Sequence, residues 1–90
     1  MNYRLLLHKS VIKFIEKRPA KQRQELKDRL EMLKANPYGN AQLDIKPMQG
    51  YADLYRLRVG QYRFLYQVKQ NELIVFVMKA GNRGDVYKNT

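Results

Sequence analysis

The pattern of apolar and polar residues over positions 53–68 predicts a β-hairpin. Two runs of alternating character flank residues 60–61, Gly-Gln, and a pair that begins with glycine suits a tight two-residue turn. With that turn, Arg58 lies directly opposite Arg63, and successive side chains of each strand point to opposite faces of the sheet. The apolar and aromatic face carries Tyr55, Leu57, Val59, Tyr62, Phe64 and Tyr66. The predicted hairpin is therefore apolar on one face and cationic on the other.

Three arginines occupy the cationic face of this hairpin. Arg58 faces Arg63, and Arg56 lies opposite Leu65 and diagonal to Arg63, within reach of a long side chain. Arginines on a strand face are more often a solvated surface than a site. Like charges that face each other across two strands, however, destabilise a sheet. The opposed pair therefore indicates a site that holds an anion.

The N-terminal part of the chain predicts one strand followed by two helices. Residues 3–7 are mostly apolar, which favours a strand, and Ser10 is a suitable N-cap for a helix that begins at Val11. The side of this helix that we expect to be buried carries Val11, Ile12, Phe14 and Ile15. Pro19 ends the first helix and suits the first turn of a second one, which extends to about Ala35. The apolar stripe of the second helix consists of Leu26, Leu30 and Leu33.

The rest of the chain predicts turns, a polar connector and one further strand. Residues 36–40, Asn-Pro-Tyr-Gly-Asn, have strong turn chemistry, and a polar connector follows to about Tyr51. Residues 73–78 are apolar throughout, which favours a central strand covered on both faces. The predicted fold is α+β: an N-terminal strand and a helical hairpin packed on a mainly antiparallel four-stranded sheet. Residues 1–90 are predicted to form a single domain.

Composition narrows the partners of this domain. Lysine and arginine number 18 against 8 aspartate and glutamate, and the resulting net charge of +10 favours nucleic acid, an anionic membrane surface or an acidic protein as partner. The longest apolar run is far too short to span a bilayer, so we expect no membrane partner. The chain has no cysteine, which fits the cytoplasm, and its single histidine, His8, is expected at the surface. We expect no metal or other cofactor.

Three segments of the sequence carry a resemblance to a known family. They are residues 50–66, Gly-Tyr-Ala-Asp-Leu-Tyr-Arg-Leu-Arg-Val-Gly-Gln-Tyr-Arg-Phe-Leu-Tyr; residues 81–87, Gly-Asn-Arg-Gly-Asp-Val-Tyr; and residues 36–39, which follow the helical hairpin. In this order they resemble the RelE/ParE toxin superfamily, and more narrowly its RelE branch. The resemblance implies a RelE-like fold and a type II toxin, an endoribonuclease that cleaves mRNA in the A site of the ribosome. It also implies a cognate antitoxin, which we expect to be acidic and RelB-like.

The resemblance implies which residues form the site. Arg56 and Arg58 match the family's pair of basic residues on the strand, and Arg63 matches its arginine after the hairpin turn. Arg83 matches the arginine of the last loop, and Tyr87 matches the C-terminal tyrosine. The best-known member of the family has lysines in place of the first arginine pair.

These residue types suit cleavage of RNA without a metal ion. The adjacent 2′-hydroxyl attacks phosphorus, and the transition state gains negative charge on phosphoryl oxygens, which fixed guanidinium groups stabilise. Arg63 and Arg83 are expected to form this clamp. Arg56 and Arg58 would hold flanking phosphates or add to the clamp. Tyr87 is a candidate for proton transfer or for stacking on a base, and the identity of the general base stays open.

Two other functions stay open from the sequence. A ParE-like inhibitor of DNA gyrase would share the fold, although such relatives generally lack the full set of basic strand residues together with Arg83 and Tyr87. A non-catalytic basic RNA-binding module is the second alternative. It stays open because Asn82, which we count as a candidate for substrate binding, stands where many relatives carry a histidine.

Overall fold

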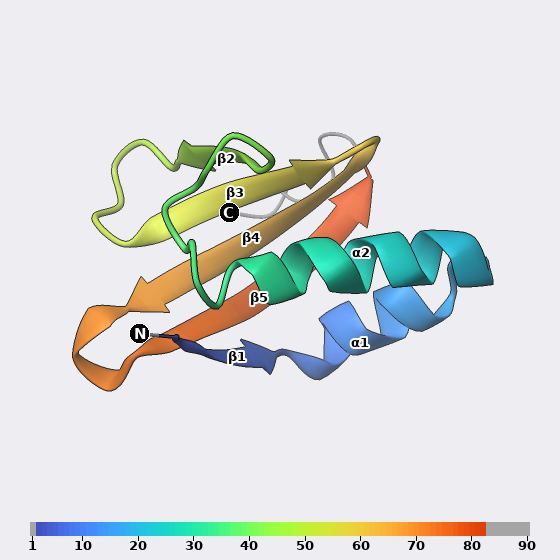
Figure 1. The fold of residues 1–90 in the computed structure, drawn as a ribbon, viewed down its shortest axis with the longest axis horizontal. Helices are drawn as coiled ribbons and strands as arrows, with labels where there is room; N and C mark the ends of the chain where they lie inside the picture. The colour runs from blue at the N-terminus through green and yellow to red at the C-terminus, as the bar shows by residue number, and fades with distance from the viewer. Residues whose placement is uncertain (1, 83–90) are drawn as a thin grey trace.

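The computed structural model describes residues 2–82, which form a β-sheet with two helices packed on one face (Figure 1). The helices are α1, Lys9–Glu16, and α2, Ala20–Met32. The strands are β1, Arg4–Leu7; β2, Asp44–Pro47; β3, Leu54–Val59; β4, Tyr62–Lys69; and β5, Ile74–Asn82. Their order in the sheet is β1-β5-β4-β3-β2, and only the β1–β5 pair among these strands is parallel. The predicted α+β class, with a helical hairpin on a mainly antiparallel sheet, is confirmed.

Strand β2 is the main difference from the prediction, which had four strands and a polar connector in this part of the chain. β2 adds to the edge of β3, with Asp44 opposite Arg58. Of its four residues, Ile45 packs against the core. Pro47 is tolerated because an edge strand can lose a backbone donor on its outer side. Backbone pairing rather than apolar side chains holds this strand, so its sequence carries no hydrophobic pattern.

The predicted apolar strand at residues 73–78 is present as part of β5. One face of this strand is buried, and the other face is only partly covered. Val75 and Val77 are fully buried in the core under the helices. Phe76, which points to the other face, is half-buried, and β4 rather than β5 is the middle strand of the sheet. The prediction of double cover was wrong because an apolar run by itself does not show how much of the second face is covered.

Helix α1 begins two residues earlier than predicted, because His8 rather than Ser10 is its N-cap. The backbone of His8 is extended, and its Nδ1 accepts a hydrogen bond from the Ser10 amide at 3.1 Å. His8 is exposed, as expected for a surface histidine. Val11 and Ile15 are buried as predicted, but Ile12 is 42% exposed. Residues four apart lie on one stripe of a helix, and Ile12 lies to the side of that stripe.

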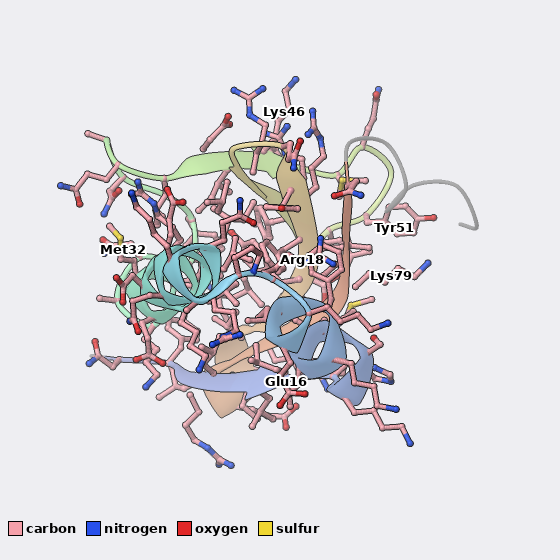
Figure 2. The ribbon with its side chains drawn as sticks, turned by 90° about the vertical axis from the view of Figure 1, so that its right-hand side faces the viewer. Glu16, Arg18, Met32, Lys46, Tyr51 and Lys79 are labelled. Carbon is pink, nitrogen blue, oxygen red and sulfur yellow. The ribbon has the colours of Figure 1, made fainter. Side chains whose placement is uncertain are left out.

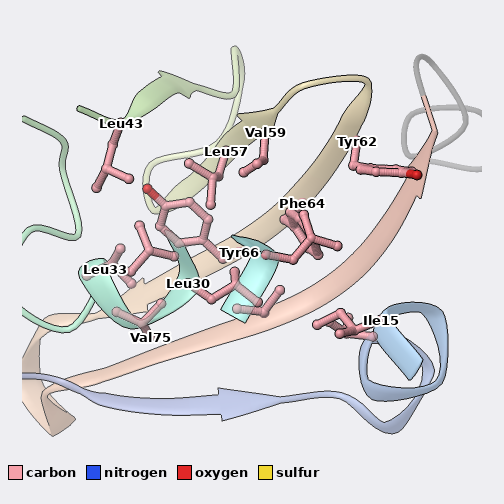
Figure 3. Packing of buried hydrophobic residues seen from close by; sticks show 14 residues of the cluster. Ile15, Leu30, Leu33, Leu43, Leu57, Val59, Tyr62, Phe64, Tyr66 and Val75 are labelled. Carbon is pink, nitrogen blue, oxygen red and sulfur yellow. The ribbon is translucent and has the colours of Figure 1, made fainter. Parts of the chain in front are cut away.

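The core lies between the two helices and the face of the sheet that they cover, which includes the aromatic face of the hairpin (Figure 3). The buried leucines of the predicted stripe are Leu26, Leu30 and Leu33. Helix α2 ends at Met32 rather than near Ala35, and a turn follows. Tyr66 is fully buried, and its hydroxyl donates to the Pro37 carbonyl oxygen at 2.6 Å. This bond links the turn after α2 to the middle strand of the sheet.

Candidate functional site

The candidate site is the face of the β3–β4 hairpin that points away from the helices, here called the arginine face (Arg56, Arg58 and Arg63). The hairpin register is the predicted one, with Arg58 directly opposite Arg63. Gly60 begins the turn with a φ of +60°, a conformation that L side chains rarely adopt. Leu57 is fully buried in the core, so its neighbours in β3 point to the opposite face.

Asp44 on β2 pairs with two of the three arginines. Its Oδ1 accepts a hydrogen bond from Arg56 Nη2 at 2.8 Å, and its Oδ2 pairs with Arg58 Nε at 2.8 Å. The Arg56 side chain is only 12% exposed, whereas that of Arg58 is 49% exposed. The sequence predicts a purely cationic face, and the structure shows that this is wrong, because a carboxylate lies among the arginines. The prediction lacked this carboxylate because it lacked strand β2.

Arg56 and Arg58 consequently differ in what they can offer to a ligand. The Nε of Arg56 is buried and has no hydrogen-bond partner in the described part of the chain. A guanidinium with so little exposed surface supports the sheet and the neighbouring carboxylate more than it contacts a large ligand. Arg58 is open enough to do so.

Arg63 supplies the third guanidinium from β4. Its partner across β5 is Gly81, which has no side chain, and its partner across β3 is Arg58. The residue is half-buried, and it makes no ion pair with any residue from 2 to 82. Within that range, Arg63 is the member of the arginine face whose positive charge no carboxylate offsets.

Two lysines that sequence reasoning missed extend this basic surface. Lys46 pairs with Arg56, and Lys79 pairs with Leu65 on the same face. Lys46 lies at the end of the molecule opposite β1, and Lys79 projects from β5 on the side away from α2 (Figure 2). Leu65 is 3% exposed although it lies on this face, and its flanking residues have long aliphatic stems. The sequence signal for Lys46 is its spacing of two residues from Asp44. This spacing places the two side chains on one face only if the segment is a strand.

The structure does not bring Asn82 onto the arginine face. Asn82 pairs with Tyr62, so its position in β5 belongs to the helix side of the sheet, and the residue is exposed. Arg83 and Tyr87 lie outside the described residues. Of the six candidate site residues, the structure thus groups three.

Tyr62 lies at the hairpin turn, and its acidity is altered there. Its hydroxyl donates to Gln22 Oε1 at 2.8 Å, and the Arg18 guanidinium lies 5.5 Å from the centre of its ring. The neighbouring side chain of Gln61, and to a smaller extent that of Arg18, lowers the pKa of Tyr62. Because this phenol lies on the helix side of the sheet, it does not face a ligand bound on the arginine face.

The charged groups on this surface are mainly the guanidinium groups of the arginine face and the ammonium groups of Lys46 and Lys79. No three acidic or histidine side chains between residues 2 and 82 are grouped so as to hold a metal ion. No helix in this range is long and apolar enough to cross a membrane. Guanidinium groups bind and stabilise phosphate and other anions, so the arginine face is suited to an anionic ligand.

Comparison with known proteins identifies the family. The family model for the ParE toxin of the type II toxin–antitoxin system parDE matches residues 7–87. The protein named RelE1 of Methanocaldococcus jannaschii is 33% identical over 89 residues, which is 99% of this chain and 99% of that protein. The chain belongs to the RelE/ParE toxin superfamily.

Solved structures of RelE toxins share the fold of this toxin. A chain of the archaeal RelE–RelB complex from Pyrococcus horikoshii OT3 superposes with a TM-score of 0.83 at 29% identity, covering 94% of this chain and 99% of that chain. Isolated RelE of E. coli gives a TM-score of 0.74 at 26% identity, covering 90% of this chain and 84% of that chain. The predicted RelE-like fold and the predicted RelE branch are confirmed, and the chain is a type II toxin of the RelE type.

Proposed function

We propose that this RelE-type toxin is a ribosome-dependent endoribonuclease that cleaves mRNA in the A site. The observation that carries the proposal is the arginine face, where Arg58 and Arg63 are held directly opposite each other. Asp44 pairs with Arg58, but no carboxylate among residues 2–82 pairs with Arg63, so this face keeps a positive charge that an anion can bind. The similarity to RelE proteins supports mRNA as the source of that anion.

The reaction would use the RNA's own 2′-hydroxyl as nucleophile. The 2′-hydroxyl gives up its proton as its oxygen forms a bond to the adjacent phosphorus, and the bond from phosphorus to the 5′-oxygen of the next nucleotide breaks. That oxygen takes up a proton, so the products are a 2′,3′-cyclic phosphate and a free 5′-hydroxyl. Negative charge grows on the phosphoryl oxygens in the transition state, and fixed guanidinium groups stabilise it more than they stabilise the ground state. In this proposal Arg63 and Arg83 bind those oxygens, and Arg58 adds a third guanidinium.

The other candidates have supporting roles in this proposal. Tyr87 stacks on a base or takes part in proton transfer. Arg56 stabilises the arginine face through its contact with Asp44, since its side chain is mostly buried against the sheet. Asn82 contacts RNA outside the arginine face, from the end of β5. Alignment of mRNA by the ribosome supplies much of the rate, since positioning alone can lower a barrier by about 7–11 kcal/mol.

We further propose that an acidic, RelB-like antitoxin neutralises the toxin by covering or distorting the arginine face. The net charge of +10 and the open Arg58 favour an acidic partner. Solved structures of similar toxins include RelE–RelB complexes from Pyrococcus horikoshii and Methanococcus jannaschii. An amphipathic helix or an added strand are natural ways for such a partner to bind.

The proposed function is tested by mapping mRNA 5′ ends after brief induction of the toxin. New ends that keep phase with the codons are expected, and they should be absent for Arg63→Ala. Arg4→Ala is a matched control, since Arg4 is an exposed arginine of β1, at the other edge of the sheet. Intact mRNA together with a DNA-damage response would instead support gyrase inhibition, and this alternative is worth measuring because the matched family model is that of ParE.

A further inference from the structure

One carboxylate on the edge strand β2 contacts two arginines of β3 at once. Asp44 Oδ1 lies 2.8 Å from Arg56 Nη2, and Asp44 Oδ2 lies 2.8 Å from Arg58 Nε. The backbone fixes this arrangement, because Asp44 is the direct partner of Arg58 in the antiparallel β2–β3 ladder. The position of the carboxylate is therefore set by the sheet and not by a flexible loop.

The atoms that Asp44 contacts on Arg58 leave the outer edge of that guanidinium free. A guanidinium has five N–H donors in a fixed plane, and its two terminal nitrogens can bind a phosphate with two parallel hydrogen bonds. Asp44 contacts Nε, and neither terminal nitrogen of Arg58 has a hydrogen-bond partner among residues 2–82. The side chain is 49% exposed, so this outer edge is accessible.

The opposed arginine explains why such an anchor is needed. Arg58 and Arg63 repel each other across β3 and β4, and a long side chain with many rotamers would move away from its neighbour. Asp44 attracts Arg58 from the β2 side and limits those rotamers. Arg56, which is mostly buried, holds the other oxygen of the carboxylate in place.

We propose that Asp44 is a positioning residue, which holds the Arg58 guanidinium with its terminal edge directed to an RNA phosphate. The inference rests on the proposed function and assigns a role within it to a residue of the edge strand. In the opposite role, Asp44 would mimic phosphate and keep RNA away from the arginine face. The terminal nitrogens of Arg58 argue against that role, since no hydrogen bond from residues 2–82 occupies them and they stay open to a phosphate.

Asp44→Asn and Asp44→Ala test the proposal, with Asp28→Asn and Asp28→Ala as matched controls. Asp28 is an exposed carboxylate on α2, so its replacement makes the same change in net charge far from the site. The rate of mRNA cleavage on programmed ribosomes should fall about tenfold to a hundredfold at saturating toxin for the Asp44 variants, a range typical of losing a partner that orients a ligand group. Their affinity for ribosomes should stay the same or increase, since one negative charge is gone. Asp44→Glu should restore part of the rate.

A double-mutant cycle separates positioning from a general loss of structure. If Asp44 acts through Arg58, adding Asp44→Ala to Arg58→Ala should cause little further loss of rate. Independent, multiplying losses would overturn the proposal. Faster cleavage by Asp44→Ala would also overturn it, and would favour the role of a phosphate mimic.

Nuclear magnetic resonance gives a readout that does not depend on cleavage. The Arg58 Nε–Hε signal of ¹⁵N-labelled toxin should shift in Asp44→Asn and stay in place in Asp28→Asn. An unshifted signal would show that the ion pair does not form in solution and would overturn the inference, whatever the toxin does to mRNA. If the wild type cuts no mRNA, the proposed function fails, and the positioning role that rests on it fails with it even where the signal shifts.

Discussion

Replacing Arg58 with alanine should remove activity while leaving the fold almost unchanged. The substitution breaks the ion pair between Arg58 and Asp44, whose side chains are 49% and 43% exposed. Pairs with this exposure contribute about 0.2–1 kcal/mol to stability. The same substitution also relieves the repulsion between Arg58 and Arg63, which costs about 0.2–1 kcal/mol for directly opposed like charges.

The two terms have opposite signs and similar size, so they nearly cancel. We expect the free energy of unfolding of Arg58→Ala to stay within about 1 kcal/mol of the wild type, or roughly 4–8 °C in Tm. Asp44 keeps its contact with Arg56 in this variant, so no charge loses its only partner. Cleavage should fall on the order of a hundredfold or more, as it does when one donor that stabilises a developing anion is removed.

The assay pairs thermal melting with mRNA cleavage on programmed ribosomes, with two control variants. Leu57→Ala removes a fully buried neighbour on the other face and should cost about 2–5 kcal/mol of stability, while the fraction that stays folded keeps its activity. Arg4→Ala makes the same change in charge at the far edge of the sheet, and it should keep both the stability and the cleavage rate of the wild type. If Arg58→Ala unfolds the protein, or if it folds normally and cleaves at the wild-type rate, the assignment of the arginine face is wrong.

Four further measurements test the packing of Tyr66 and other parts of the proposed function. Tyr66→Phe loses the hydrogen bond to the Pro37 carbonyl oxygen and should lower the free energy of unfolding by about 1 kcal/mol at neutral pH, measured by urea denaturation. Burial raises the pKa of Tyr66 above its usual 10.0, so Tyr66 ionises at a lower pH in the unfolded state than in the folded state. The free energy of unfolding of the wild type should therefore fall as the pH rises past 10.0. An equally steep fall in Tyr66→Phe would show that Tyr66 is not the cause. Naked RNA should be cut poorly with or without chelator, and efficient cutting that chelator abolishes would refute a reaction without metal. In the antitoxin complex, an arginine face that stays both open and undistorted while toxicity is blocked would exclude inhibition at that face.

The hairpin could be predicted from the sequence because two local signals agree. Alternation with a period of two set the faces, and Gly60 at the start of a two-residue turn set the register. The structure shows the same pairing, with Arg58 opposite Arg63. Where one face of a strand must be buried, a slip of one residue would expose the whole apolar set, so this register is strongly specified.

Asp44 could not be predicted as a member of the site because its strand lacks the local signals that specify the hairpin. Its strand is short, and Ile45 is the residue of that strand that packs on the core. Edge strands of this kind are specified by backbone pairing with a neighbour that is distant in sequence, and side-chain patterns do not report it. The N-cap of α1 was missed similarly, because His8 is not among the usual capping residues, whereas Ser10 is.

The core and the arginine face are two sides of the same strand, and this coupling explains how a small domain can hold repelling charges in place. Leu57 is fully buried between Arg56 and Arg58 in the sequence of β3, so the free energy that keeps Leu57 in the core also directs both arginines outward. Burial of Leu57 is worth about 1.5–3 kcal/mol, which exceeds the repulsion of one opposed arginine pair. The core therefore sets the direction of the arginines, and the edge strand, through Asp44, sets the orientation of their guanidinium groups.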